Sequence, residues 1–307
     1  MIDSLDDQLG YVPEVVGTVS RPKVLVCGGM GGSFLPALAL RFLGATPYVI
    51  AHRDYGLPSP VLEGATYVAI SYSGETEETV SFAKEAIANG LPLSVIAGGG
   101  TLLALASEHN LPHVVIPQGP VPREALIVMV RALLALIGEE HLLPDSASFD
   151  QGGAEHEGEV LAGLLSERLP IFYSSGRNEA LSYFAKIFSN ETAKIPAFAN
   201  VLPEFNHNEL QGFGGIDSSR ALRDPLYGVF LADATDHERV QKRMALTQRV
   251  LSGAGVPSVK IDLPSASRVE TLLYGFWLIR TTAHALAKQY GVDPDETKLI
   301  DSFKTML

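Results

Sequence analysis

The segment YVAISYSGETEETVSFAKEAIANG, residues 67–90, contains the strand, turn and helix that repeat along this chain. Its first residues form an apolar run, which is typical of a strand that is buried on both faces. Hydroxyls and a glycine follow at Ser71–Thr76, and acidic residues then stand where the first turn of a helix favours negative charge. The segment therefore predicts a strand that passes through a polar turn into an amphipathic helix.

The same alternation extends through the first half of the chain. Other short apolar runs are KVLVCG (23–28), PYVIA (47–51), LSVIAG (93–98) and HVVIP (113–117), and most precede a helical pattern. Strands that alternate with helices indicate a parallel sheet covered by helices on both faces. We predict an α/β fold.

The pattern restarts after a polar, glycine-bearing segment, LPDSASFDQGGAEHEG (143–158), which we interpret as a linker. PIFYSSGRNEALSYFAKIF (170–188) resembles the first strand, turn and helix, and GVFLADATDHERV (228–240) resembles the segment quoted above. A repeated order of elements indicates duplication. We expect two similarly built domains, residues 1–145 and 146–307.

Composition limits the partners. The net charge of −12 argues against nucleic acid or an anionic membrane as the main partner, because both attract basic surfaces. The single cysteine, Cys27, fits a reducing compartment, and the acidic start MIDSLDDQLG does not resemble a signal peptide. The apolar run at 125–138 is interrupted by Arg131 and is too short to span a membrane. We expect a cytoplasmic protein.

The turn after residue 70 is the first candidate site. Ser71, Ser73 and Thr76 offer three hydroxyls next to the free N–H groups of a helix start, and together these form a phosphate-binding arrangement without lysine. An ordinary capped helix is the alternative, but it needs only one hydroxyl. We interpret the glutamates that follow as residues of the helix start.

The glycine-rich turn CGGMGGS (27–33) also joins a strand to a helix. It is not a dinucleotide-binding fingerprint, because Phe34 stands where the last glycine belongs, and it lacks the lysine of a P-loop. Its glycines either let a ligand approach the main-chain amides or only allow a tight turn.

Glu191 is the candidate base. It follows Phe184, Ile187 and Phe188 at helical spacing, so it lies on their apolar stripe. Burial raises the pKa of a carboxyl group, as a general base requires. A frayed helix end with Glu191 paired to Lys194 is the alternative.

Three further residues are candidates for proton transfer or for contact with a ligand. His207, within LPEFNHNELQG (202–212), is a candidate acid/base, although a loop histidine often only bonds to main chain. A metal-binding interpretation of His207 lacks partner residues. Lys304 lies near the C-terminus, where it is either a ligand contact or a solubilising charge. Arg123 is expected at a helix start, where the dipole disfavours a cation, so it is a candidate anion contact.

The C-terminal segment DPDETKLIDSFKTML (293–307) predicts a helix with Asp293 as its N-cap. Leu299, Phe303 and Met306 would form its packed stripe. Thr297 shares another face with Lys304, so both side chains could reach one ligand.

Taken together, these motifs resemble the bifunctional phosphoglucose/phosphomannose isomerase family, a branch of the sugar isomerase (SIS) domain proteins. GMGGS, SYSGETEET, PREAL, NETAK, LPEFNHNELQG and ETKLIDSFK follow that family's order and spacing over nearly the whole chain. The resemblance implies two flavodoxin-like SIS subdomains, each an αβα sandwich with a parallel sheet. It also implies interconversion of glucose 6-phosphate and mannose 6-phosphate with fructose 6-phosphate through a cis-enediol, without metal or cofactor.

The resemblance assigns roles to residues. It implies that Glu191 moves a proton between C2 and C1 and that Arg123 steadies the enediol charge. It implies that His207 and Lys304 open the sugar ring with Thr297 nearby, in a homodimer whose active site lies at the subunit interface and takes its histidine from the partner subunit. The implied phosphate-binding and pocket-lining residues are Ser71, Ser73, Thr76, Gly31, Gly32 and Ser33.

Two positions depart from the family pattern. Phe34 replaces a glycine, and Asn206 stands where relatives often have a second histidine. Both leave the preference between glucose and mannose substrates open. The alternatives are a sugar-phosphate isomerase of different specificity and a non-catalytic sugar-phosphate sensor, although a sensor usually carries a DNA-binding module that this acidic chain has no room for.

Overall fold

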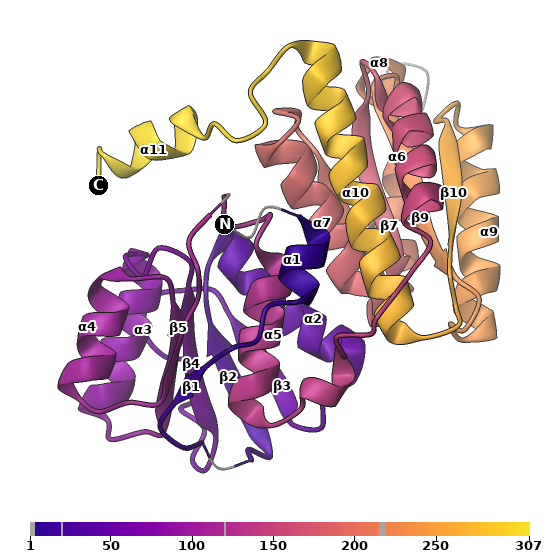
Figure 1. Ribbon diagram of the computed structural model, residues 1–307. Coiled ribbons are helices and arrows are strands. Elements are labelled where there is room, and N and C mark those ends of the chain that lie inside the picture. Colours follow the sequence, from indigo (N-terminus) through magenta and orange to yellow (C-terminus); the bar gives the residue numbers. More distant parts are fainter. Residues whose placement is uncertain (1–3, 20, 120, 215–218) are drawn as a thin grey trace. The chain divides into compact units, whose positions relative to one another are not determined.

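The structure, a computed structural model, describes residues 4–19, 21–119, 121–214 and 219–307 (Figure 1). It forms two compact units, Met1–Ala147 and Ser148–Leu307, which we call unit 1 and unit 2. The boundary proposed from the sequence, between residues 145 and 146, lies close to this division.

Unit 1 is built on a six-stranded sheet with the strand order β1-β6-β5-β4-β2-β3. All neighbouring strands are parallel except β1, which pairs antiparallel with β6 at one edge and which the apolar runs did not predict. The strands are β1 (Val15–Val16), β2 (Val24–Gly28), β3 (Tyr48–His52), β4 (Thr66–Ser71), β5 (Leu93–Ala97) and β6 (His113–Val115).

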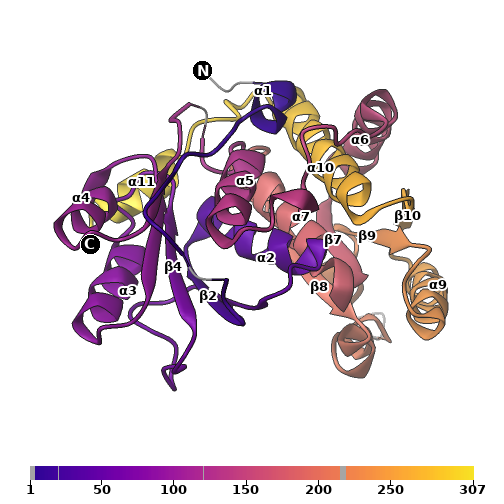
Figure 2. The same ribbon diagram turned by 60° about the horizontal axis from the view of Figure 1, so that its bottom comes forward.

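Helices cover both faces of this sheet (Figure 2). The pair α2 and α5 packs on one face with α1 against α5, and the pair α3 and α4 packs on the other. Every residue of β4 is buried, as its apolar sequence predicts for a central strand. The helices are α1 (Leu5–Leu9), α2 (Leu35–Leu43), α3 (Glu77–Ala88), α4 (Gly100–Glu108) and α5 (Leu126–Ile137), with the 3₁₀ helices η1 (Gly31–Phe34) and η2 (Glu140–Leu142).

Unit 2 has a four-stranded parallel sheet with the order β10-β9-β7-β8. The helices α6, α7 and α10 pack together on one face, and α9 covers the other. The strands are β7 (Leu169–Ser175), β8 (Phe198–Leu202), β9 (Leu226–Asp233) and β10 (Ser258–Leu263). The helices are α6 (Gln151–Leu165), α7 (Glu179–Glu191), α8 (Arg220–Arg223), α9 (Glu238–Gly253), α10 (Arg268–Tyr290) and α11 (Lys298–Lys304), with η3 (Gly176–Asn178), η4 (Glu204–His207) and η5 (Glu209–Gly214).

The interpretation of residues 143–158 as a linker is wrong for its second half, where α6 begins at Gln151. Asp150 caps this helix by accepting a hydrogen bond from the amide of Gly153 at 2.9 Å. A Cβ on Gly158 would lie 2.8 Å from the carbonyl oxygen of Leu278, so this glycine lets α6 approach α10 closely. Gly158, one of the three glycines in the predicted linker, therefore serves helix packing.

Each unit has one position where the strand order reverses. In unit 1 the chain leaves β2 toward β3 and leaves β4 toward β5, and in unit 2 it leaves β7 toward β8 and β9 toward β10. The crevice at the carboxyl ends of such strand pairs is where α/β sheets bind ligands. The ends of β2 and β4, and of β7 and β9, are therefore the first places to search for a site.

No helix among the described residues combines the length and the apolar character needed to cross a membrane.

Candidate active site

The hydroxyl turn follows β4 in unit 1, at the reversal of strand order. The hydroxyl oxygens of Ser71 and Thr76 lie 2.9 Å apart, and Ser71 Oγ also accepts a hydrogen bond from the Gly74 amide at 3.1 Å. Thr76 is the N-cap residue of α3, but its hydroxyl makes no capping bond to the helix. The turn thus holds two hydroxyls together beside the N-terminus of a long helix, which attracts anions.

Ser73 lies in the same turn with its side chain exposed, and its Oγ accepts a hydrogen bond from the Glu75 amide at 3.2 Å. Gly74 between them has φ +76°, and a Cβ there would lie 1.9 Å from the carbonyl oxygen of Gly99. Only glycine fits this position. The turn is therefore fixed by main-chain packing as well as by the hydrogen bonds to its hydroxyls.

The glycine turn after β2 joins the hydroxyl turn. Ser33 Oγ accepts a hydrogen bond from the Tyr72 amide at 2.9 Å, and this bond is buried. A Cβ on Gly32 would lie 2.8 Å from the backbone nitrogen of Arg123, so the Arg123 segment packs directly on the glycine turn. The structure therefore brings together the unit 1 candidates, which are Gly31, Gly32, Ser33, Ser71, Ser73, Thr76 and Arg123.

Arg123 does not start a helix, contrary to the prediction, because α5 begins three residues later at Leu126. It lies in the preceding turn and is only 1% exposed. Its main chain packs on the glycine turn, next to the other unit 1 candidates.

Phe34 ends η1 with its ring 6% exposed. The guanidinium of Arg53 lies 5.2 Å from the centre of this ring, at a distance typical of a cation–π interaction. The Phe34 side chain therefore packs inside unit 1.

The glutamates of the turn have structural partners. Glu75 accepts hydrogen bonds from the Thr101 amide at 2.7 Å and from the Thr101 hydroxyl at 2.8 Å, so it caps the start of α4. Glu77 is in the first turn of α3, as expected, and accepts a hydrogen bond from the Tyr55 hydroxyl at 3.2 Å. Glu75 therefore supports a neighbouring helix, which the sequence did not reveal.

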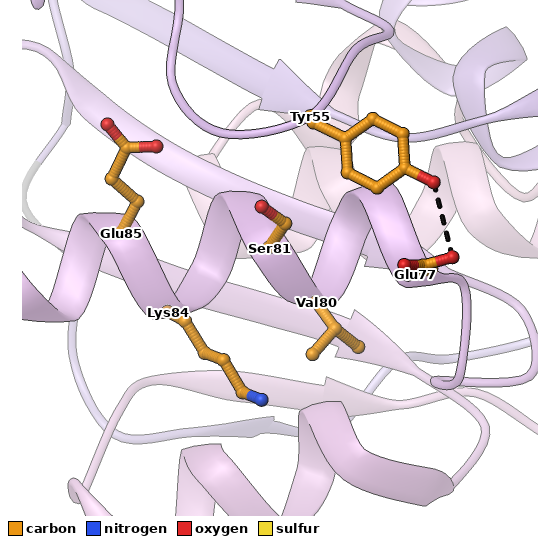
Figure 3. Close-up of a pocket in the computed structure, with 6 residues that line it drawn as sticks. All are labelled: Tyr55, Glu77, Val80, Ser81, Lys84 and Glu85. Atoms are coloured by element: carbon orange, nitrogen blue, oxygen red, sulfur yellow. Dashed lines mark hydrogen bonds between the residues drawn. The ribbon is translucent and has the colours of Figure 1, made fainter.

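A groove of about 510 Å³ runs along α3 between Tyr55 and Lys84 (Figure 3). None of the predicted site residues lines it. Its walls carry the Tyr55–Glu77 hydrogen bond and the carboxylate of Glu85, which accepts from the Leu57 amide at 3.0 Å. The groove thus marks where the loop after β3 is fastened to α3.

The second group of candidates lies in unit 2. Glu191 is the last residue of α7 and is half-buried, beside a pocket of about 660 Å³ that Thr297 also lines. Lys194, on the same pocket, donates a hydrogen bond from its Nζ to the main-chain carbonyl of Glu191. The structure therefore brings Glu191 and Thr297 to one cavity.

His207 and Lys304 do not line this pocket. His207 ends η4 with its side chain exposed, and Lys304 ends α11, also exposed. Unit 2 thus presents the histidine and the lysine outward and keeps only Glu191 and Thr297 together.

The predicted start of the C-terminal helix is wrong. Asp293 Oδ1 accepts from the Asp295 amide at 2.9 Å in a local turn, and α11 begins only at Lys298, with Thr297 as its N-cap residue. Thr297 Oγ1 instead donates to the Asp301 carboxylate at 3.1 Å. The predicted packed stripe is exposed: Leu299 is 84%, Phe303 58% and Met306 76% exposed.

Residues 154–307 match the family model described as the bacterial phospho-glucose isomerase C-terminal SIS domain. The bifunctional phosphoglucose/phosphomannose isomerase of Aquifex aeolicus is 31% identical over 298 residues, 93% of this chain and 90% of that protein. The Caldicellulosiruptor bescii protein of the same name is 32% identical and covers 92% of this chain and 89% of its own length.

This chain belongs to the bifunctional phosphoglucose/phosphomannose isomerase family.

One relative of this chain is named for a different reaction. The D-glucosamine-6-phosphate 4-epimerase of Sulfolobus acidocaldarius is 34% identical over 300 residues, 95% of this chain and 91% of the epimerase. The same scaffold therefore occurs in proteins named for different reactions, so the reaction has to be tested directly.

Solved structures agree with the fold of this isomerase family. A glucose-6-phosphate isomerase like protein from Thermus thermophilus superposes with a TM-score of 0.62 at 23% identity, covering 97% of this chain and 96% of that one. A hypothetical protein from the same organism gives a TM-score of 0.71 at 18% identity, covering 93% and 83%. At these identities the likeness shows the fold alone, which is the predicted SIS-type α/β fold.

In unit 2 of this chain, polar side chains form a hydrogen-bonded network at the ends of β7 and β9, where the strand order reverses. Arg268 Nη1 donates to Asp233 Oδ2 at 3.0 Å and to Asn178 Oδ1 at 2.8 Å, and Ser175 Oγ donates to Asp236 Oδ1 at 2.8 Å. Sequence reasoning missed this network. The signal available was the polar run that follows each of the two strands, at the positions of the glycine and hydroxyl turns of unit 1.

The charges of this network affect one another. Burial opposes ionisation of Asp233, but hydrogen bonds from Thr235 and Asn178 and the charge of Arg268 outweigh it and hold the pKa of Asp233 below its usual value. Burial, helped by the charge of Asp233, raises the pKa of Asp236 despite the hydrogen bond from Ser175. Burial first, and then the charge of Arg177, lowers the pKa of Arg268 to about 10.

Among the described residues, no group of three or more histidine, cysteine, aspartate or glutamate side chains is arranged to hold a metal ion.

Proposed function

We propose that this chain interconverts glucose 6-phosphate and mannose 6-phosphate with fructose 6-phosphate. The observation that carries the proposal is the paired hydroxyls of Ser71 and Thr76 beside the N-terminus of α3, in a chain whose relatives are named for these substrates. A helix N-terminus and hydroxyls bind a phosphate group without a lysine.

Each residue then has a role. Ser71, Ser73 and Thr76 bind the phosphate, and the glycine turn lets the sugar approach main-chain amides. Glu191 takes the proton from C2 and returns it to C1 through a cis-enediol, a task for which a half-buried carboxylate on a pocket wall is suited. Arg123 stabilises the negative charge that develops on the enediol oxygen.

Ring opening precedes this proton transfer. His207 and Lys304 move the proton from the O1 hydroxyl to the ring oxygen, and Thr297 assists. We propose a homodimer in which the partner subunit's histidine completes the site, and the exposed position of His207 outside the pocket beside Glu191 supports this. This mechanism needs no metal ion.

The decisive experiment measures fructose 6-phosphate formation from both aldose phosphates, in the presence of a chelator. We expect activity on both, and a loss of at least a hundredfold in kcat for Glu191→Gln. Glu179→Gln is the matched control, because Glu179 is an exposed glutamate at the other end of the same helix. Wild-type inactivity on both substrates, full activity of Glu191→Gln or a strict metal requirement would each refute the proposal. Epimerisation of glucosamine 6-phosphate without isomerisation would favour the reaction named for the Sulfolobus relative.

A further inference from the structure

The segment that carries His207 has little regular structure of its own. It consists of the two short 3₁₀ helices η4 and η5, joined at Asn208. A group that transfers protons must be held to within about 0.5 Å of its working position. This segment lacks the regular backbone hydrogen bonds of a long helix or strand, so side-chain contacts must hold it in place.

The Glu209 side chain connects this segment to the sheet of unit 2. Its Oε1 accepts a hydrogen bond from the Tyr173 hydroxyl at 2.8 Å, and its Oε2 accepts one from the Asn200 side-chain amide. Tyr173 and Asn200 are directly paired residues of the neighbouring strands β7 and β8. One carboxylate thus bridges the two strands and fixes the start of η5 to the sheet.

The tyrosine in this bridge cannot move or lose its proton easily. Tyr173 is 0% exposed, and its ring packs edge-on against Phe205 at 4.6 Å and stacks with Phe230 at 5.0 Å. Burial, followed by the charge of the Glu209 carboxylate, raises the pKa of the Tyr173 phenol well above its usual value. The phenol therefore remains a hydrogen-bond donor at any working pH.

The residue before His207 is anchored as well. Asn206 donates from Nδ2 to Thr247 Oγ1 at 2.9 Å, and its Oδ1 accepts from Arg243 at 3.4 Å. Phe205 is 0% exposed in the core of unit 2. His207 is consequently an exposed side chain on a segment that is fastened on both sides, to α9 before it and to the sheet after it.

We propose that Glu209 is a positioning residue for His207. This inference rests on the proposed function, since it assumes that His207 takes part in catalysis. Glu209 holds η4 and η5 against the sheet through Tyr173 and Asn200, so that the imidazole is presented in one orientation. A glutamine at this position keeps the size and shape of the side chain. Its NH2 group would face one of the two donors, so glutamine cannot accept both hydrogen bonds.

The test is a double-mutant cycle between Glu209→Gln and His207→Asn, with kcat, KM and the unfolding midpoint measured for each variant. We expect Glu209→Gln to lower kcat at least tenfold with KM within twofold. In the His207→Asn background, Glu209→Gln should lower kcat no further. Tyr173→Phe, which removes one hydrogen bond and keeps the ring, should lower kcat less than Glu209→Gln and remains informative if Glu209→Gln is poorly folded.

Glu204→Gln is the matched control. Glu204 belongs to η4 and accepts a hydrogen bond from the Asn208 side chain at 2.8 Å, but both residues are exposed. Its kcat should stay within twofold of wild type. Wild-type activity of Glu209→Gln, or an equal loss in the presence and absence of His207, would overturn the positioning role.

Amide hydrogen exchange separates this inference from the proposed function. Glu209→Gln should speed exchange across residues 204–214, whereas Glu204→Gln should not. This measurement needs no substrate and no activity. If the wild type proves inactive, the proposed function fails, and unchanged exchange at 204–214 would independently refute the anchoring by Glu209.

Discussion

The hydroxyl oxygens of Ser71 and Thr76 lie 2.9 Å apart across the turn that links β4 to α3. Thr76 stands at the N-cap position of α3 without using its hydroxyl to cap the helix. A threonine at an N-cap usually contributes about 1 kcal/mol through that bond. Here the bond is not made, and this fits hydroxyls kept for a ligand.

Replacing Thr76 by valine should therefore affect binding more than stability. We expect KM for glucose 6-phosphate to rise at least tenfold for Thr76→Val and for Ser71→Ala, measured by steady-state kinetics. Thr79→Val is the control, because the Thr79 hydroxyl is buried in the same helix and has no hydrogen-bond partner in the part of the chain that the structure describes. Its loss should leave KM unchanged and stability equal or higher. An unchanged KM for Thr76→Val would remove the hydroxyl turn from the phosphate site.

Replacing Glu75 should affect stability more than substrate binding. Because its carboxylate caps α4 through Thr101, Glu75→Ala should lower the free energy of unfolding by about 1 kcal/mol. KM and kcat should remain within twofold of wild type. Urea unfolding and steady-state kinetics test the two halves of this prediction, and a large rise in KM would place Glu75 in the site after all.

Replacing Phe34 by alanine should lower stability and leave the substrate preference nearly unchanged. The ring is buried with Arg53 packed over it, so Phe34→Ala should destabilise unit 1 by about 3 kcal/mol. The ratio of kcat/KM for glucose 6-phosphate to that for mannose 6-phosphate should change less than twofold. A larger change would show that the ring contacts the sugar.

The parts of the structure that depend on short-range patterns could be predicted from the sequence. Apolar runs such as residues 67–70 locate the buried strands, and the hydroxyls at 71–76 mark the turn, because strand, turn and helix are adjacent in the chain. The start of α11 was misplaced, since Asp293 closes a local turn with Asp295 and a capping residue fits either arrangement. Gly158 of α6 was misread for a long-range reason, its close approach to α10.

The sequence offers candidate site residues one by one, but not the contacts between them. The bond between Ser33 and Tyr72 joins residues 39 positions apart, and that between Glu209 and Tyr173 joins residues 36 apart. No local pattern encodes such pairs, because strand order decides which turns meet. The network around Asp233 is of the same kind, with Arg268 arriving from the start of α10.

That network gives a pH prediction whose sign follows from Asp233. Its pKa is lower in the folded state, so its ionised form stabilises the fold above the unfolded-state pKa of about 3.9, and this contribution disappears as the pH falls through the folded-state value. Asp233→Asn removes the negative charge. It also places a side-chain NH2 group next to groups that donate hydrogen bonds to Asp233. We expect it to lower the free energy of unfolding by about 3 kcal/mol at pH 7, as for other broken buried ion pairs.

Urea unfolding of wild type and Asp233→Asn between pH 3 and pH 7 tests this expectation, and the difference between them should shrink toward pH 3. Asp262→Asn is the matched control in the same unit. Its carboxylate pairs with Lys260 at 2.7 Å, but the two side chains are 72% and 47% exposed, so the loss should stay below about 1 kcal/mol at every pH. A difference for Asp233→Asn that does not depend on pH would show that lost packing, and not lost charge, causes the destabilisation.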